Sequence, residues 1–102
     1  MKTKKDIIKD LKDVRYYYAN RKDFDNAAKS ISESTVIKKA EYYNELIKNA
    51  PPKLFNMYLA FVINNNSQAT VADDWGFCIE NIKYYCSKMY DYLLQEAKKS
   101  ES

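Results

Sequence analysis

Apolar residues return every three or four positions along the first part of the chain, which is the spacing of one face of an α-helix. This pattern predicts a helix from Lys4 to Lys22. Its apolar stripe consists of Ile7, Leu11, Val14 and Tyr18. Successive tyrosines at 16–18 must point in different directions around such a helix, so at least one of them is expected to face solvent or a partner.

A second stripe of the same kind predicts a helix from Glu33 to Lys48, capped by Ser32 or Ser34. Its apolar members are Val36, Ala40, Tyr43 and Ile47. The polar residues 23–32 are expected to connect the two helices, with a short helical turn around their two adjacent alanines.

A pair of prolines ends the second helix, because a proline moves the residue before it out of helical geometry. Pro52 also suits the first turn of a new helix. That third helix is expected from Lys53 to Ile63, and it is apolar on most sides, as a central helix of the core would be. Three asparagines at 64–66 then end it, since asparagine readily adopts turn conformations.

Two further helices are predicted, from Ser67 to Trp75 and from Cys78 or Ile79 to Lys98. Gly76 lies between them, and glycine most easily takes the left-handed conformation in which helices end. The buried stripe of the last helix is expected to be Ile82, Tyr85 or Cys86, Met89 and Leu93.

These patterns assign the chain to the all-α class, as a single domain of five helices. Its 102 residues suffice for one modest core, and a single glycine and two prolines leave few breaks. Residues 1–50 form the N-terminal amphipathic helices, and residues 51–98 form a helix-turn-helix unit with a long last helix.

Composition excludes most catalytic chemistry. The chain has no histidine, the commonest general base and metal ligand, and no glycine-rich loop that would hold a phosphate. Cys78 and Cys86 would lie about 12 Å apart along one helix, too far for a disulfide. We therefore expect buried or half-buried free thiols, no metal, no cofactor and no enzymatic activity.

Without a signal peptide or an apolar run of membrane length, a soluble cytoplasmic protein is expected.

Charge is unevenly distributed along the chain. The net charge is +3, yet residues 1–22 hold eight basic and three acidic side chains, and the remainder is slightly acidic. The N-terminal lysines can supply phosphate contacts to a nucleic acid, although a solvated helix face would carry the same residues. Fifteen lysines against two arginines fit an AT-rich bacterial or phage genome.

The segment 66–85 meets the requirements of a DNA-reading helix-turn-helix: a short capped helix, a tight turn, and a second helix that can enter the major groove. Asn81 can form two hydrogen bonds to an adenine. Guanine edges or phosphates are within reach of Lys83, Tyr84 and Lys88. The backbone amide of Gln68 opens the first helix and can bind a phosphate. The remaining residues that point outward or along the rim are Ile79, Glu80 and Ser87.

Several features of residues 53–94 occur together in one known family. They are an aromatic-rich helix before the motif, a small residue before an acidic pair, the turn glycine, an isoleucine in the recognition helix, and a lysine, an aromatic and a leucine pair in its tail. In that order, the residues are Leu54, Met57 and Tyr58, then Ala72, Gly76 and Ile82, then Lys88, Tyr90, Leu93 and Leu94. This pattern resembles the C-terminal helix-turn-helix of phage late-transcription regulators of the ArpU and RinA type, which is similar to the promoter-reading domain of bacterial sigma factors.

The resemblance implies a small phage or bacterial transcription regulator that binds double-stranded promoter DNA and has RNA polymerase as a further partner. A homodimer would place two recognition helices one DNA turn apart, with the apolar stripe of the first helix as its seam. Two residues depart from the family pattern. Cys78 stands where a serine usually caps the recognition helix, and Glu80 stands where a basic or neutral residue is usual. Residues 67–94 also hold four acids and two lysines, so the motif itself would bind phosphates weakly.

Two other functions stay open. The same scaffold can be a protein-binding module whose acidic, tyrosine-rich surface binds or inhibits RNA polymerase, another regulator or a host defence protein. A helical immunity protein of the bacteriocin type has a similar size and similar lysine-rich helices. Salt-dependent binding to DNA would favour the transcription regulator, and capture of a protein without any DNA affinity would favour the module.

Overall fold

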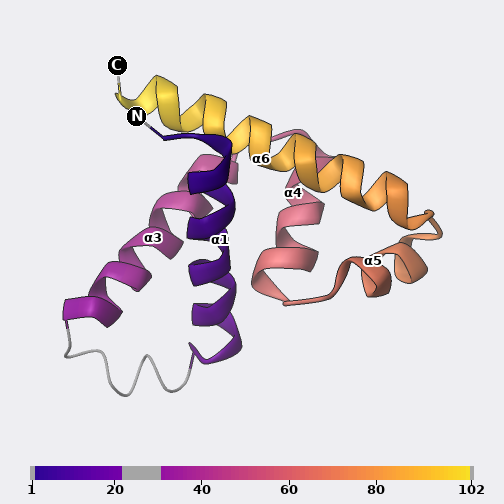
Figure 1. Ribbon diagram of the computed structural model, residues 1–102, viewed down its shortest axis with the longest axis horizontal. Helices are drawn as coiled ribbons and strands as arrows, with labels where there is room; N and C mark the ends of the chain where they lie inside the picture. Colours follow the sequence, from indigo (N-terminus) through magenta and orange to yellow (C-terminus); the bar gives the residue numbers. More distant parts are fainter. Residues whose placement is uncertain (1, 22–30, 102) are drawn as a thin grey trace.

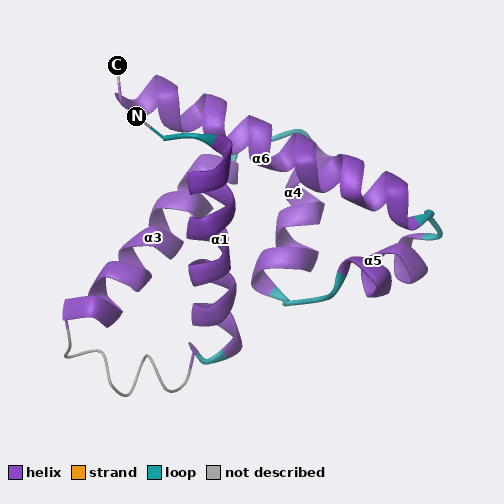
Figure 2. Ribbon diagram, viewed as in Figure 1, coloured by secondary structure: helices purple, strands orange, loops and turns teal. Residues whose placement is uncertain are grey.

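The computed structural model describes residues 2–21 and 31–101, and every regular element in this part of the chain is a helix (Figures 1 and 2). The elements are α1 (Lys4–Ala19), α3 (Ile31–Ile47), α4 (Pro52–Tyr58), which continues as the π-helix η1 (Leu59–Ile63), α5 (Gln68–Trp75) and α6 (Ile79–Glu101). The all-α class and the five helices are confirmed. Most of the connection predicted over 23–32, with its helical turn at Ala27 and Ala28, lies outside the described residues.

The long helix α6 organises the molecule. Helices α1 and α3 lie side by side, and α6 runs across the ends of α1, α3 and α4 (Figure 1). Helix α5 packs under the N-terminal end of α6. The Cα atoms span 42 × 34 × 22 Å. Because four elements contact one face of α6, a single core extends from the first helix of the chain to the last.

The apolar stripes that the sequence predicts form this core. Ile7, Leu11 and Val14 of α1 are at most 1% exposed. On α6 the buried residues are Ile82, Cys86, Met89, Leu93 and Ala97. Tyr85 is only half-buried, so Cys86 is the member of the stripe at that turn. Tyr16 is 62% exposed, as the run of three tyrosines requires.

The apolar stripe of α1, which the sequence suggests as a dimer seam, is buried within its own chain. Ile7, Leu11 and Val14 face the other helices of the same chain, and Tyr18 packs against them. A stripe that is already covered within the chain has no surface left for a second copy. The prediction that this stripe forms a homodimer seam is therefore wrong.

Two helix ends also differ from the predictions. Helix α3 begins at Ile31, before both candidate caps, so Ser32 and Ser34 lie inside the helix and neither is its N-cap. Helix α1 ends at Ala19, because Asn20 leaves helical geometry and donates from its backbone and its side-chain amide to the carbonyl of Tyr16, and the predicted end at Lys22 lies outside the described residues. The cysteines differ from each other. Cys86 is buried as expected, whereas Cys78 is exposed.

The third helix ends at the asparagines because one of them takes the left-handed conformation. Asn65 has a φ of 57°, and its side-chain amide donates to the carbonyl of Val62 at 3.3 Å and to that of Arg15 at 3.0 Å. The Arg15 guanidinium in turn stacks 4.1 Å from the centre of the Phe61 ring and donates to the Phe61 carbonyl at 3.1 Å. These contacts join the end of η1 to α1.

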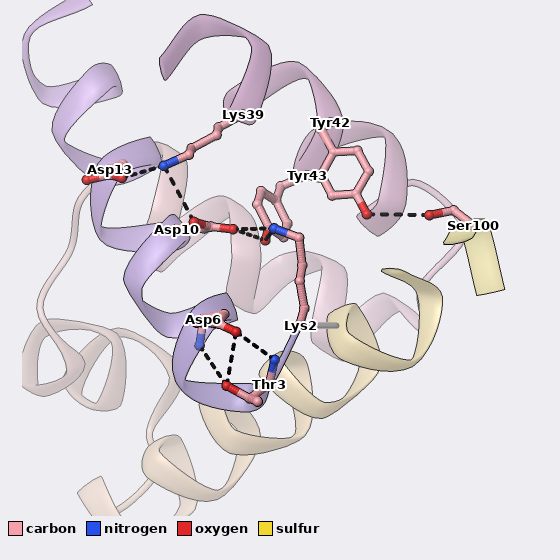
Figure 3. A network of polar contacts seen from close by, with 9 residues as sticks. All are labelled: Lys2, Thr3, Asp6, Asp10, Asp13, Lys39, Tyr42, Tyr43 and Ser100. Atoms are coloured by element: carbon pink, nitrogen blue, oxygen red, sulfur yellow. Dashed lines mark hydrogen bonds and ion pairs between the residues drawn. The ribbon is translucent and has the colours of Figure 1, made fainter. Parts of the chain in front are cut away.

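A buried carboxylate holds the N-terminal residues against α1 and α3 (Figure 3). Asp10 accepts hydrogen bonds from the Tyr43 hydroxyl and from the Lys2 ammonium at 2.7 Å, and Lys39 lies 3.5 Å away. Burial works against the charge of Asp10, but the bonds from Lys2 and Tyr43 outweigh it, and the pKa of Asp10 is lowered. Burial and the bond to Asp10 raise the pKa of Tyr43. At neutral pH Asp10 is therefore ionised, and the Tyr43 hydroxyl keeps the proton that it donates.

Candidate nucleic-acid interface

The turn between α5 and α6 has the geometry that its residues predict. The Ser67 hydroxyl caps α5 by accepting from the Thr70 amide at 3.1 Å. At the other end Gly76 has a φ of 70°. The Phe77 amide donates to the Ala72 carbonyl at 3.0 Å, and the Gly76 amide donates to the Asp73 carbonyl. Together these two hydrogen bonds form a Schellman motif. The first turn of α6 begins at the Cys78 carbonyl, which accepts from the amides of residues 81 and 82.

This turn presents the outer side of α6 to solvent. Asn81, Tyr84 and Lys88 are exposed, and their spacing of three and four residues places them within about 60° of one another around the helix. The Lys88 ammonium lies 5.3 Å from the centre of the Tyr84 ring. We call these three residues the outer face of α6. They are the predicted site residues that the helix brings together.

The other predicted site residues are placed differently. Ile79, Glu80 and Lys83 are exposed, and Lys83 lies about 160° around the helix from Asn81. Ser87 is half-buried and accepts a hydrogen bond from the Lys4 ammonium at 2.6 Å. Gln68 is half-buried at the start of α5.

The charges of α6 are mixed on its outer side, since Asp91 follows Lys88 by three residues, about one helical turn. Asp91 lies on the α1 side, 3.1 Å from the Lys4 ammonium, and the helical repeat places Glu80 on the same side of Tyr84 as Asp91. On the opposite flank lies Lys53 of α4, whose ammonium is 3.1 Å from the Tyr85 hydroxyl. The α4 flank of α6, where Lys53 lies, is therefore basic, whereas acidic and basic side chains are mixed on its outer side.

A row of aromatic rings follows this basic flank. The ring centres of Trp75 and Phe77 are 6.2 Å apart, those of Phe77 and Tyr85 are 6.0 Å apart, and those of Tyr85 and Tyr84 are 5.4 Å apart. Lys53 lies over two of these rings, 4.7 Å from the centre of Tyr85 and 5.6 Å from that of Phe77. Such distances are typical of cation–π contacts, which hold the ammonium in place without neutralising it.

A pocket of about 550 Å³ opens at the end of this row. Its lining residues come from the start of α4 and the end of α5, and they are Pro52, Lys53, Asn56, Trp75 and Phe77. The pocket is shallow and widely open to solvent. Its only charged lining side chain is that of Lys53.

The sequence pattern does not single out Lys53 as part of this surface, and it includes Lys4 only among the N-terminal lysines. Lys53 contacts a residue 32 positions away in the chain, and Lys4 contacts one 83 positions away. No local pattern encodes such pairs. The sequence does place Lys53 in the first turn of the helix that precedes the motif. A side chain at that position can turn towards a packed neighbour.

The chain matches no protein-family model, no curated protein and no solved structure at a significant level. Among the described residues, no group of three or more cysteine, aspartate or glutamate side chains is arranged to hold a metal ion. None of the described helices combines the length and the apolar character that crossing a membrane requires.

Proposed function

We propose that the protein is a small phage or bacterial transcription regulator that binds promoter DNA with the outer face of α6. The observation that carries this proposal is the placement of Asn81, Tyr84 and Lys88 on one exposed face directly after a tight turn. A helix presented in this way can enter the major groove, where an asparagine forms two hydrogen bonds to adenine. Helices α5 and α6 would then act as a helix-turn-helix of the ArpU, RinA and sigma-factor kind.

The charge distribution is compatible with this role on one flank only. Lys53 lies on the side of α6 away from Asp91, Lys88 lies one helical turn before Asp91, and no carboxylate forms a described ion pair with either lysine. Phosphate contacts are therefore expected on the α4 side of the recognition helix. Lys4 contributes less than the sequence suggests, because Asp91 and Ser87 already bind its ammonium.

The test is selection of duplexes from a random pool, followed by binding measurements at several salt concentrations. Asn81→Ala should lose about 1–3 kcal/mol of preference at one base pair. Lys88→Ala should weaken binding to all duplexes and reduce the salt slope by about one. Lys38→Ala, which removes an exposed lysine of α3, serves as the matched control and should change neither quantity. If Asn81→Ala kept the sequence preference of the wild type, the outer face of α6 would not be the surface that reads DNA.

A protein-binding module on the same scaffold is the second candidate. It is favoured by two large apolar side chains that α6 exposes, Tyr84 at 55% and Ile79 at 37%. RNA polymerase, another regulator or a host defence protein would be its partner. The absence of salt-dependent binding to any duplex would support this candidate over the regulator.

A further inference from the structure

Apart from Lys53, the residues of the pocket beside α4 and α5 have no role in the proposed contact with DNA. It is lined by Pro52, Lys53, Asn56, Trp75 and Phe77, and it holds about 550 Å³. Pockets for small ligands enclose most of the ligand surface, whereas this one is shallow and open on one side. Its shape fits one large side chain anchored from a bigger partner, as at the centre of protein interfaces.

The walls of the pocket define the apolar part of the partner. Trp75 and Phe77 are half-buried, and their rings pack edge to face at 6.2 Å, so both are held in position. Aromatic residues that remain accessible in a concave site are enriched at protein interfaces, because a large rigid ring gains contact area at little cost in entropy. An aromatic or leucine-like side chain complements this lining.

Lys53 defines the charged part of the partner. Its ammonium is held by the Tyr85 hydroxyl at 3.1 Å and by two rings, and none of the ion pairs among the described residues involves it. A fixed cation at the edge of an apolar pocket, without a counter-ion of its own, is complementary to a carboxylate. The required anion is a single charge placed on the α4 side.

Two exposed acids of α5 favour a protein partner over a nucleic acid. Asp73 and Asp74 directly precede Trp75 on α5, and both are exposed. They would repel the phosphates of a polynucleotide that ran from Lys53 along α5, but a protein segment can carry one carboxylate towards Lys53 and none towards α5. We propose that this pocket is a docking site for a segment of a partner protein that carries a large apolar side chain next to a carboxylate.

The test uses a displayed library of random twelve-residue peptides, panned on the intact protein. Enriched peptides should combine an aspartate or glutamate with a large apolar residue. Trp75 is the only tryptophan of the chain, so its fluorescence reports binding of the synthetic peptides at the pocket itself. Lys53→Glu should weaken their binding at least about tenfold, since it replaces attraction by repulsion. Asn56→Phe, which fills the pocket, should do the same, and Lys38→Glu is the matched control for charge.

Several outcomes would overturn the proposal: no enriched peptide, enriched peptides without the acidic and apolar pair, or equal affinity for the wild type and Asn56→Phe. Binding of single-stranded or duplex DNA that changes Trp75 fluorescence and is lost in Asn56→Phe would assign the pocket to nucleic acid, and would also overturn it. Asn81→Ala separates this proposal from the function proposed above. That variant should keep its affinity for the peptides while it loses its sequence preference on DNA.

Discussion

Asp10 shows how one side chain connects three parts of the chain. It is the only charged side chain among the described residues that is buried, and it binds Lys2, Tyr43 and Lys39. An ionised buried carboxylate is stable only when several donors compensate for its lost hydration. Here the donors come from the residues before α1 and from α3, so ionisation of Asp10 and packing of α1 against α3 depend on each other.

The pH dependence of stability should report this cluster. The pKa of Asp10 is lowered in the folded protein, so its contribution to stability is present above the unfolded pKa of about 4 and is lost as the pH falls through the folded value. Asp10→Asn should cost about 1–3 kcal/mol at pH 7 and should flatten the fall in stability below about pH 5. Urea unfolding at a series of pH values measures both effects.

The control is Asp91→Asn, which alters an exposed ion pair with Lys4 and should cost less than about 1 kcal/mol. If Asp10→Asn and the wild type lost stability in parallel between pH 5 and pH 3, the compensation argued for Asp10 would be absent.

At the scale of elements, the turn between α5 and α6 decides how the outer face of α6 is presented. Gly76 ends α5 in the left-handed conformation, and the Schellman hydrogen bonds satisfy the last carbonyls of that helix. A Cβ atom added at Gly76 would meet no other atom within 4 Å. The need for glycine is therefore one of backbone conformation and not of space.

Substitutions at Gly76 should follow the intrinsic cost of that conformation. Gly76→Ala should destabilise the protein by about 1–2 kcal/mol. Gly76→Asn should cost less, because asparagine tolerates positive φ, as Asn65 does in this chain with a φ of 57°. Chemical denaturation of the two variants measures the difference. Equal losses for alanine and asparagine would mean that the site is limited by something other than φ.

At the scale of the whole molecule, α1 belongs to the same core as the C-terminal helices. Leu11 and Ile7 are buried with residues of α6 and η1 in one cluster, and Arg15 ties α1 to η1 through Phe61. The N-terminal helices are thus part of the scaffold that supports α6, and they do not form a separate association surface through their apolar stripe.

Loss of a core side chain from α1 should therefore lower the stability of the folded chain itself, and should not act through the dissociation of a dimer. Leu11→Ala should lower the free energy of unfolding by about 2–5 kcal/mol. The loss should be the same at two protein concentrations that differ tenfold. Lys12→Ala, at the exposed neighbouring position, should stay within about 0.5 kcal/mol of the wild type. A loss in Leu11→Ala that grows on dilution would restore the stripe as a dimer contact.

Local sequence determined the helices and their buried faces. The spacing of Ile82, Met89 and Leu93 is sufficient to identify the inner side of α6, because burial of one stripe follows from the helical repeat. The same repeat identifies Asn81, Tyr84 and Lys88 as outward, so this much of the candidate site was predictable. The start of α3 was not, because two serines suited to capping lie inside the helix.

Tertiary structure alone decided which elements those faces meet. The position of Lys53 over Tyr85, the ion pair of Lys4 with Asp91, and the burial of the α1 stripe within its own chain all join residues far apart in sequence. A periodic pattern indicates that a helix face is apolar or charged, but the pattern carries no information about which surface covers that face. Helix packing covers the stripe of α1 and places Lys53, which forms no ion pair with the described residues, at an aromatic pocket.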